Sequence, residues 1–425
     1  MLNLYRFLPA MGLALLLGSC SDDKDTVALP DFSTSKTYTG NNLELYYNNE
    51  LMPGKSADVK LEDGNLNIRF YQTFDLSQLS GMGLTGSLPG PGVTPGDDSL
   101  TLRVPVNADS GRYSIAGFGE TDAVTFSYTG EVTSERMIFS ISDAKLKNTI
   151  FAGSVFAPAP IEKSGLVSYS SLPFHLVWEI DPAVGFDLPL SEILKIMVTA
   201  PVIPVYNNTA YTSVAQAFEN VVKSVALTDS GDIPVMFIST LGGAAHLATS
   251  SGNMLQYIPS DNGLKLYVNP LSALGQVLLY TSDNKNDEKF DFAAMLKKTP
   301  RAVMGSDDET SNAAGMDPAL TKAMVEVLIK ALAPQISGGV PLTVEPTAKG
   351  ADIYISTETS VTFLATVLQY ALANPAIAGA LQEAIGSSNI PQLSPEDLAG
   401  LLQKLPQFLE ATTKLEIGLS FVKDL

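Results

Sequence analysis

The sequence contains little of the chemistry on which metal centres and activated nucleophiles depend. Its 425 residues include one cysteine, two histidines and one tryptophan. One cysteine cannot form an intramolecular disulfide, and neither His175 nor His246 has the neighbouring histidine or cysteine that a tetrahedral metal site requires. The GxSxG, HExxH and P-loop spacings are also missing, and the Gly-rich "TLGGAAH" lacks the GxGxxG spacing. We therefore expect no metal, no cofactor and no catalytic residue that a motif identifies.

Positive charge is scarce as well. Lysine and arginine number 26 against 45 aspartates and glutamates, which gives a formal net charge of −19. Nucleic acid and anionic lipid headgroups both require a cluster of basic residues, and none stands out, so neither is an expected partner. The mean hydropathy is nevertheless positive, at +0.15. Either the core is large, or apolar side chains line a cavity.

Long hydrophobic runs are missing too, because no segment reaches the roughly eighteen apolar residues of a membrane-spanning helix. The shorter run from Phe7 to Leu17 follows Arg6 and ends in "LLLGSCSDDKD", which holds Cys20. This stretch resembles the lipobox of bacterial lipoproteins. The resemblance implies that residues 1–19 are a signal peptide and that Cys20 carries the acyl chains that attach the protein to a membrane. The alternative is a secretory signal with an incidental cysteine.

The residues after the cysteine are acidic and polar: Ser21, Asp22, Asp23, Lys24 and Asp25. They resemble the export signal of surface lipoproteins in Bacteroidetes-type bacteria. The resemblance implies an outer-membrane protein that faces the cell exterior, whereas a purely solvated tether is the simpler alternative. Residues 20–36 have little apolar periodicity, so we expect a flexible acidic tether.

Residues 37–160 are predicted to form an antiparallel β domain. Segments such as "NLNIRFY" and "AVTFSYTG" alternate apolar and polar residues, and glycine, aspartate and asparagine separate them, as in a barrel or sandwich. The Gly/Pro-rich stretch from Ser77 to Asp98 interrupts this pattern. A lid, a partner-contacting arm and a loosely packed insertion are all compatible with it. The segment "APAPIEKSG", residues 157–165, is a plausible hinge.

Residues 166–425 are predicted to be α+β. "SVAQAFENVVKSV" has helical apolar spacing, and the chain ends in the helix "SPEDLAGLLQKLPQFLEAT" and the strand "KLEIGLSFV". Two helix–hairpin–helix units, at about 210–281 and 317–373, are predicted to form a repeat, with chance similarity as the alternative. In each unit a glycine (Gly263 or Gly350) precedes an apolar-Tyr-apolar triplet by three residues. A tight turn with positive φ would require glycine at this position.

The opening "KTYTGNNLELYYNNE" resembles the calycin-like barrels of many Bacteroidetes lipoproteins of unknown function. The later helix–hairpin–"YVNP"–helix units resemble the carboxy-terminal part of the same families. They are also faintly similar to tubular lipid-binding proteins related to the bactericidal permeability-increasing protein. The resemblance implies an α+β fold with a calycin-like amino-terminal domain, and it assigns no functional residue.

Three functions remain open at this point. The first is a non-catalytic envelope protein that binds an apolar, lipid-like molecule in a cavity or groove. Its pocket candidates are Trp178, Tyr267, Tyr354 and Phe363, although a core role is the simpler reading of each. The second is a glycan- or protein-binding surface module beside an outer-membrane uptake system, and the third is a hydrolase with dispersed carboxylates. The sequence does not identify a protein partner.

Overall fold

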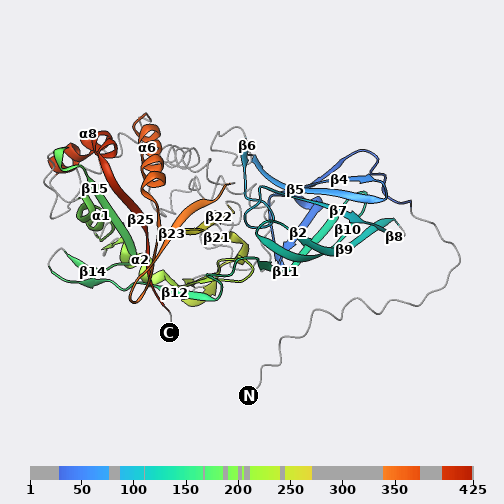
Figure 1. The fold of residues 1–425 in the computed structure, drawn as a ribbon, viewed down its shortest axis with the longest axis horizontal. Helices are drawn as coiled ribbons and strands as arrows, with labels where there is room; N and C mark the ends of the chain where they lie inside the picture. Colours follow the sequence, from blue (N-terminus) through green and yellow to red (C-terminus); the bar gives the residue numbers. More distant parts are fainter. Residues whose placement is uncertain are drawn as a thin grey trace, which may run out of the picture.

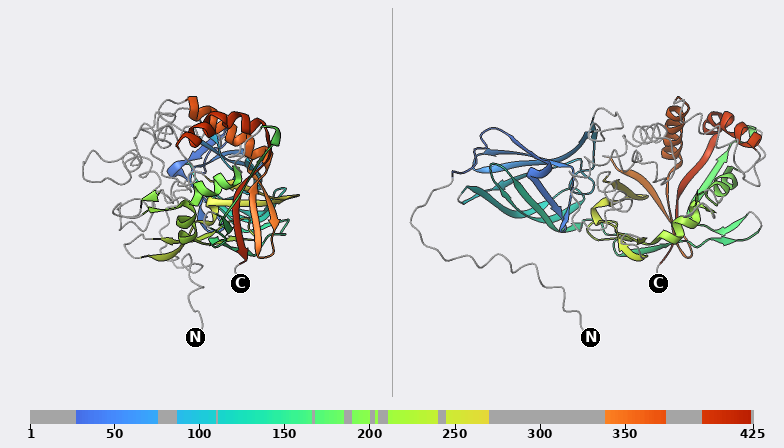
Figure 2. Two further views of the ribbon diagram at one scale, coloured as in Figure 1. Left: turned by 90° about the vertical axis from the view of Figure 1, so that its left-hand side faces the viewer. Right: turned by 180° about the vertical axis from the view of Figure 1, so that it is seen from behind.

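The computed structural model describes residues 28–75, 87–109, 111–165, 168–184, 190–199, 203–204, 211–239, 245–269, 338–373 and 395–423. Cys20 and the acidic run from Ser21 to Asp25 lie outside these residues, as does the predicted signal peptide. The described chain forms two lobes that lie side by side, mostly built of β-sheet (Figures 1 and 2).

The amino-terminal lobe consists of two sheets. The five-stranded sheet has the order β1-β4-β5-β6, with β7 also paired to β5, and its strands are β1 (Lys36–Thr39), β4 (Lys55–Glu62), β5 (Asn65–Asp75), β6 (Ser87–Pro89) and β7 (Ser99–Pro105). The six-stranded sheet has the order β3-β2-β11-β10-β9-β8, formed by β3 (Glu50–Leu51), β2 (Leu43–Tyr47), β11 (Met137–Leu146), β10 (Val124–Val132), β9 (Arg112–Glu120) and β8 (Asn107–Asp109). Their pairing is antiparallel except between β2 and β11. The mostly antiparallel β structure predicted for this part of the chain is thereby confirmed.

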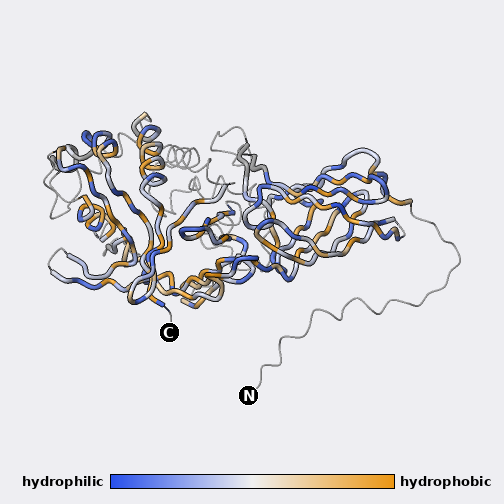
Figure 3. Tube along the Cα trace, in the orientation of Figure 1, coloured by the Kyte–Doolittle hydropathy of each residue, from blue (hydrophilic) through white to orange (hydrophobic). Residues whose placement is uncertain are grey.

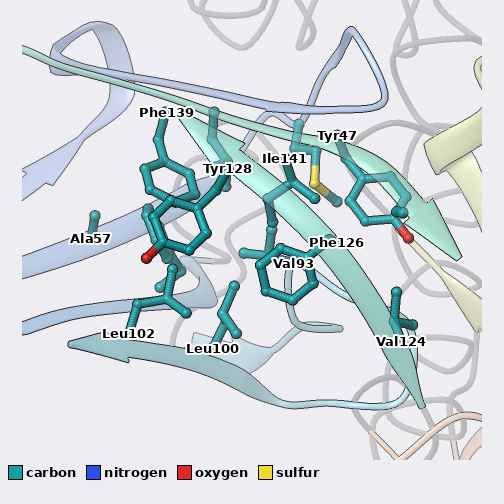
Figure 4. Packing of buried hydrophobic residues seen from close by; sticks show 14 of the residues in the cluster. Tyr47, Ala57, Val93, Leu100, Leu102, Val124, Phe126, Tyr128, Phe139 and Ile141 are labelled. Atoms are coloured by element: carbon teal, nitrogen blue, oxygen red, sulfur yellow. The ribbon is translucent and has the colours of Figure 1, made fainter. Parts of the chain in front are cut away.

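Apolar and polar residues alternate along the strands (Figure 3). The apolar set forms one core between the two sheets. Val124, Phe126 and Tyr128 of β10 point inward together with residues from the facing sheet (Figure 4). The rings of Phe70 and Phe139 lie 4.6 Å apart between their centroids, and Phe139 stacks on Tyr128 at 5.7 Å. Side chains of the protein itself therefore occupy the space that a ligand would take in a hollow barrel.

The described end of the Gly/Pro-rich segment is packed rather than loose. Residues 90–95 are all buried, and Val93 belongs to the core shown in Figure 4. The buried Lys55 ammonium holds this segment, because its Nζ donates to the carbonyls of Pro91 (2.6 Å) and Gly92 (2.9 Å) and to Gln72 Oε1 (2.6 Å). A loosely packed insertion is therefore wrong for residues 90–95, while residues 76–86 lie outside the described chain.

The folded lobe begins before the predicted boundary at residue 37. The ring of Phe32 is fully buried in the core, and its carbonyl accepts a hydrogen bond from the amide of Leu61 at 2.9 Å. The predicted tether of residues 20–36 is therefore wrong at its carboxy-terminal end. A single aromatic residue in a polar stretch shows no periodicity, which is why the sequence did not reveal it.

The carboxy-terminal lobe is built on a ten-stranded sheet of order β20-β19-β18-β12-β25-β24-β23-β22-β21, with β15 also paired to β25. Its strands are β12 (Ser154–Pro158), β15 (Phe174–Ile180), β18 (Val222–Leu227), β19 (Val235–Ser239), β20 (His246–Thr249), β21 (Leu255–Ser260), β22 (Gly263–Val268), β23 (Val340–Pro346), β24 (Gly350–Ile355) and β25 (Thr412–Lys423). Two short hairpins accompany it, β13 (Glu162–Lys163) with β14 (Tyr169–Ser171) and β16 (Ile203–Pro204) with β17 (Tyr211–Thr212).

Among the described residues of this lobe the α-helices are α1 (Leu190–Thr199), α2 (Val214–Val221), α6 (Thr357–Ala373) and α8 (Pro395–Glu410). Three of them, α1, α6 and α8, share a small core with β15 and β25 (Figure 1). Trp178 and Leu415 come from the strands, Ile193 from α1 and Phe408 from α8. The predicted terminal helix and the closing strand are confirmed as α8 and β25.

The boundary between the lobes lies earlier than predicted. β12 pairs with β18 and β25 of the second sheet, so Pro158 is part of that sheet rather than of a hinge. The first lobe ends with β11 at Leu146, and the second begins with β12 at Ser154. One large core also continues from the first lobe into the second through Phe156, Tyr257 and other residues. The lobes are thus packed against each other.

The predicted helix at 213–225 is shorter than expected. α2 ends at Val221, and Val222 begins β18, which pairs with β12 and β19. Consecutive β-branched residues favour a strand once neighbouring strands are available, and here that tertiary pairing outweighs the helical period.

The repeat prediction is only partly within the described residues, because residues 270–337 fall outside them. β22 and β24 do correspond, since each is the second strand of a hairpin in the same sheet. At both matched glycines, however, the backbone of the neighbouring strand comes too close for a side chain. A Cβ atom at Gly263 would lie 2.1 Å from the Leu342 carbonyl oxygen, and one at Gly350 would lie 2.2 Å from the Phe421 carbonyl oxygen. Gly350 does not have a positive φ, so the predicted tight turn does not explain why glycine occupies this position.

Candidate functional site

Two of the four predicted pocket aromatics are structural. Trp178 is buried in the core shared by α1, α6 and α8, and its indole Nε1 donates to Thr412 Oγ1 at 3.0 Å. Tyr267 is also buried, with its ring against the chain at Gly339, where a Cβ atom would come within 2.8 Å of ring carbons. Burial raises the pKa of Tyr267 to about 12, so its hydroxyl stays neutral. Trp178 joins the sheet to its covering helices, and Tyr267 packs against the neighbouring chain at Gly339.

The other two predicted residues lie apart from each other. Phe363 is half-buried on α6, while Tyr354 is buried on β24. The Tyr354 ring stacks on the His175 imidazole with centroids 4.4 Å apart. His175 on β15 and Tyr354 on β24 are both register partners of Gly418 on β25, so the two rings meet above the position that lacks a side chain. The structure therefore places Tyr354 in a histidine cluster that the sequence did not predict.

His175 lies between two carboxylates from neighbouring strands. Its Nε2 is 2.8 Å from Glu416 Oε2, and its Nδ1 is 3.2 Å from Asp352 Oδ2. Lys414 Nζ lies 3.2 Å from the same Glu416 oxygen. Burial disfavours the charged ring, but the hydrogen bonds to Asp352 and Glu416 outweigh it and raise the pKa of His175.

This cluster has a limited chemical repertoire. Both ring nitrogens of His175 are engaged by carboxylates, so neither offers a lone pair to a metal or to a nucleophile's proton. No group of three or more potential metal ligands occurs among the described residues. The cluster is best understood as a charged clamp that joins β15, β25 and β24.

A second polar cluster joins the lobes. Asn48 and Asn49 have φ of 48° and 70°, the left-handed conformation that a tight β2–β3 hairpin requires. The hairpin reaches Asp232 of the second lobe, whose Oδ2 accepts from Asn48 Nδ2 (3.3 Å) and whose Oδ1 accepts from Gln256 Nε2 (3.0 Å). Nearby, the Tyr47 hydroxyl donates to the Ser230 carbonyl at 2.8 Å. Burial raises the pKa of Asp232, consistent with a sealed junction.

The feature best suited to bind a ligand lies on α2. Ser213 caps this helix, accepting from the amide of Gln216 at 3.1 Å while the Gln216 side chain accepts from the Ser213 amide at 3.3 Å. The helix carries one apolar stripe at i, i+3, i+4 and i+7, formed by Val214, Ala217, Phe218 and Val221.

That apolar stripe is not covered as a core-facing stripe should be. Phe218 anchors it, with its ring centroid 5.3 Å from that of Phe174 on β15. Val214 and Val221, at the two ends, remain 39% and 44% exposed. On α1, which contacts α2, Met197 is 52% exposed. The apolar residues Met197 of α1 and Val214, Phe218 and Val221 of α2 are here called the α1–α2 surface.

Comparison with known proteins does not assign this site, since no family model matches the chain and no curated protein does either. Within the part of the chain that the structure describes, no helix combines the length and apolarity needed to cross a bilayer. The sequence predicted the apolar stripe of α2 but could not show that the rest of the lobe would leave it exposed.

Proposed function

We propose that this protein is a lipid-anchored, non-catalytic protein of the bacterial cell envelope that binds an apolar, lipid-like ligand at the α1–α2 surface. The observation that carries the proposal is the exposed stripe of α2. An amphipathic helix normally buries its apolar side against the sheet it covers, whereas here Val214 and Val221 stay open to solvent.

Covering such a surface is favourable, because each square ångström of apolar area removed from water contributes about 25 cal/mol. An acyl chain or a fused-ring lipid can lie along a helix groove without hydrogen-bonding partners, and the exposed side chains of this surface offer few. The high net negative charge argues against an anionic membrane as the occupant. A single bound lipid-like molecule is the better match.

The anchor and the location rest on the sequence. Cys20 behind a short apolar run supplies the acylated end, and the acidic residues Ser21 to Asp25 favour the outer membrane with the protein facing the exterior. The chain between this anchor and Phe32 joins the amino-terminal lobe, whereas the α1–α2 surface lies on the other lobe (Figure 1).

The finer fold assignments also belong to this proposal. We infer a calycin-like relationship for the amino-terminal lobe and a distant relationship to tubular lipid-binding proteins for the other lobe, with the two helix–hairpin–helix units as a repeat. The corresponding positions of β22 and β24 support the repeat.

The proposal can be tested with a fluorescent fatty acid and full-length protein from which lipid has been extracted. We expect the wild type to bind the probe and the double variant Met197→Ser/Val221→Ser to bind it about tenfold more weakly, since apolar contact area is lost at both helices. Leu247→Ser is the matched control, because Leu247 is 60% exposed on β20, outside the surface. If the double variant and the control bind the fatty acid with equal affinity, the α1–α2 surface is not the binding site.

A further inference from the structure

The amino-terminal lobe has an open depression on the outer side of its six-stranded sheet. Its volume is about 550 Å³, and it lies where β9, β10 and β11 approach the lobe junction. Phe118 of β9 stands at this depression with 88% of its surface exposed, the highest among the large apolar residues of the described chain. A ligand that covers this ring would remove apolar surface from water, which is favourable, so Phe118 is well placed to contact a ligand.

Two glycines explain how the ring comes to stand outside. Gly117 and Gly119 flank Phe118 on the inward side of β9, and a Cβ atom at either would lie 2.5 Å from an atom of Tyr128 or Phe126. The large rings of β10 thus fill the interior beneath the glycines, and Phe118 is left pointing to solvent. The buried Phe126 also lines the depression from below.

The polar groups around Phe118 have hydrogen-bonding capacity to spare. Thr125, Ser127, Asp143 and Lys145 line the depression, and none of these side chains makes a hydrogen bond or ion pair within the described chain. Elsewhere on the same sheet the charges are paired, as between Arg112 and Glu131 at 3.2 Å. Glu120, which also lines the depression, pairs with Lys147 at 3.0 Å, so the groups open to a ligand here are Thr125, Ser127, Asp143 and Lys145.

The backbone is also unusual at this point. The register of β10 and β11 shifts between Thr125 and Ser127, which marks a β-bulge at Asp143 and Ala144 of β11, opposite Phe126. Asp143 has φ of 52°, a left-handed conformation that is rare inside a strand. Bulges and such residues redirect side chains and recur beside binding sites. Here the bulge turns the Asp143 carboxylate toward the depression that Phe118 borders.

From this geometry we propose that the depression is a saccharide-binding site, separate from the α1–α2 surface. One aromatic ring covers the apolar face of a sugar ring, while carboxylate, ammonium and hydroxyl groups around it exchange hydrogen bonds with sugar hydroxyls. A protein interface would instead surround its aromatic anchor with further apolar contacts. Ser127 lies directly opposite Phe118 in the ladder, and Thr125 faces Glu120, so the surroundings of Phe118 are polar.

The site can be tested by affinity electrophoresis of the full-length protein through gels that contain one polysaccharide each: mannan, xyloglucan, pullulan, pectin or chondroitin sulfate. We expect retardation by at least one of them. Phe118→Ser should weaken that binding at least about tenfold. Asp143→Asn, which keeps a residue suited to positive φ, should weaken it less. Leu51→Ser, a change at another exposed apolar residue of the same lobe, should leave it unchanged.

Failure to bind any of these polysaccharides would overturn the proposal, and so would binding that survives Phe118→Ser. Because Phe118 is so exposed, the variant should unfold at the same temperature as the wild type, which circular dichroism checks. The Met197→Ser/Val221→Ser variant should bind the polysaccharide normally, since its substitutions lie on the other lobe.

Discussion

Replacing Lys55 by methionine should make the pH dependence of stability differ from that of the wild type. Lys55 is fully enclosed in the amino-terminal lobe, and its three hydrogen-bond acceptors, Gln72, Pro91 and Gly92, are all neutral. Burial without a counter-charge lowers the pKa of Lys55 from 10.5 to about 7.

The sign of the effect follows from proton binding. Between pH 7 and pH 10.5 the unfolded chain holds the proton on Lys55 and the folded chain progressively releases it, so raising the pH in this window favours the folded state. Each pH unit is worth at most about 1.4 kcal/mol, and the folded group is still half-protonated at pH 7. The gain from pH 7 to pH 9 is therefore about 2 kcal/mol.

Urea unfolding followed by circular dichroism at pH 7 and pH 9 measures this gain. Lys55→Met removes the titrating group, so the free energy of unfolding of wild type relative to the variant should rise by about 2 kcal/mol between the two pH values. Lys60→Met on the same strand is the control, because Lys60 is exposed and pairs with Glu62 at 2.5 Å. A difference that stays constant with pH would refute a buried, weakly basic Lys55.

Two further predictions concern the carboxy-terminal lobe. Because the pKa of His175 is raised in the folded state, its clamp stabilises the fold fully below about pH 6.5 and loses that contribution as the pH rises through the folded pKa. An NMR titration, in which a His246→Asn variant assigns the two histidines, should show that His175 titrates above about pH 6.5. A titration midpoint below about pH 6.5 would contradict the clamp. Gly418→Ala should destabilise the protein by about 1–3 kcal/mol in urea unfolding, because the new Cβ would lie 2.1 Å from the Ile353 carbonyl oxygen. Gly400→Ala in α8, where nothing lies within 4 Å, should instead stabilise it by about 0.5–1 kcal/mol, and similar effects at both positions would contradict the close packing at Gly418.

Local periodicity was sufficient to predict several elements. The strands around Val124 and Trp178, the helix that begins at Pro395 and the closing strand from Thr412 all occur in the structure. Each has a period of two or 3.6 that depends only on neighbours in sequence. The end of α2 at Val221 shows the limit, because pairing with β12 and β19 decided it.

The arrangement of polar residues could not be predicted in the same way. His175 meets Asp352 and Glu416 only because β25 places their strands side by side. Lys55 reads as an ordinary surface lysine in sequence, and its burial depends on a Gly/Pro-rich segment that has no period. The "GFG" at Gly117 to Gly119 was the one local signal for the saccharide site, since an aromatic residue between two strand glycines suggests an unusual environment.

The most direct test of a lipid-like ligand is mass spectrometry of what the protein carries from its own membrane. Full-length protein is purified under mild conditions and extracted with organic solvent beside the Met197→Ser/Val221→Ser variant. We predict a defined lipid species in stoichiometric amount in the wild-type extract and much less of it in the variant. Equal amounts in both, or no lipid beyond the acyl chains proposed for Cys20, would contradict binding at the α1–α2 surface.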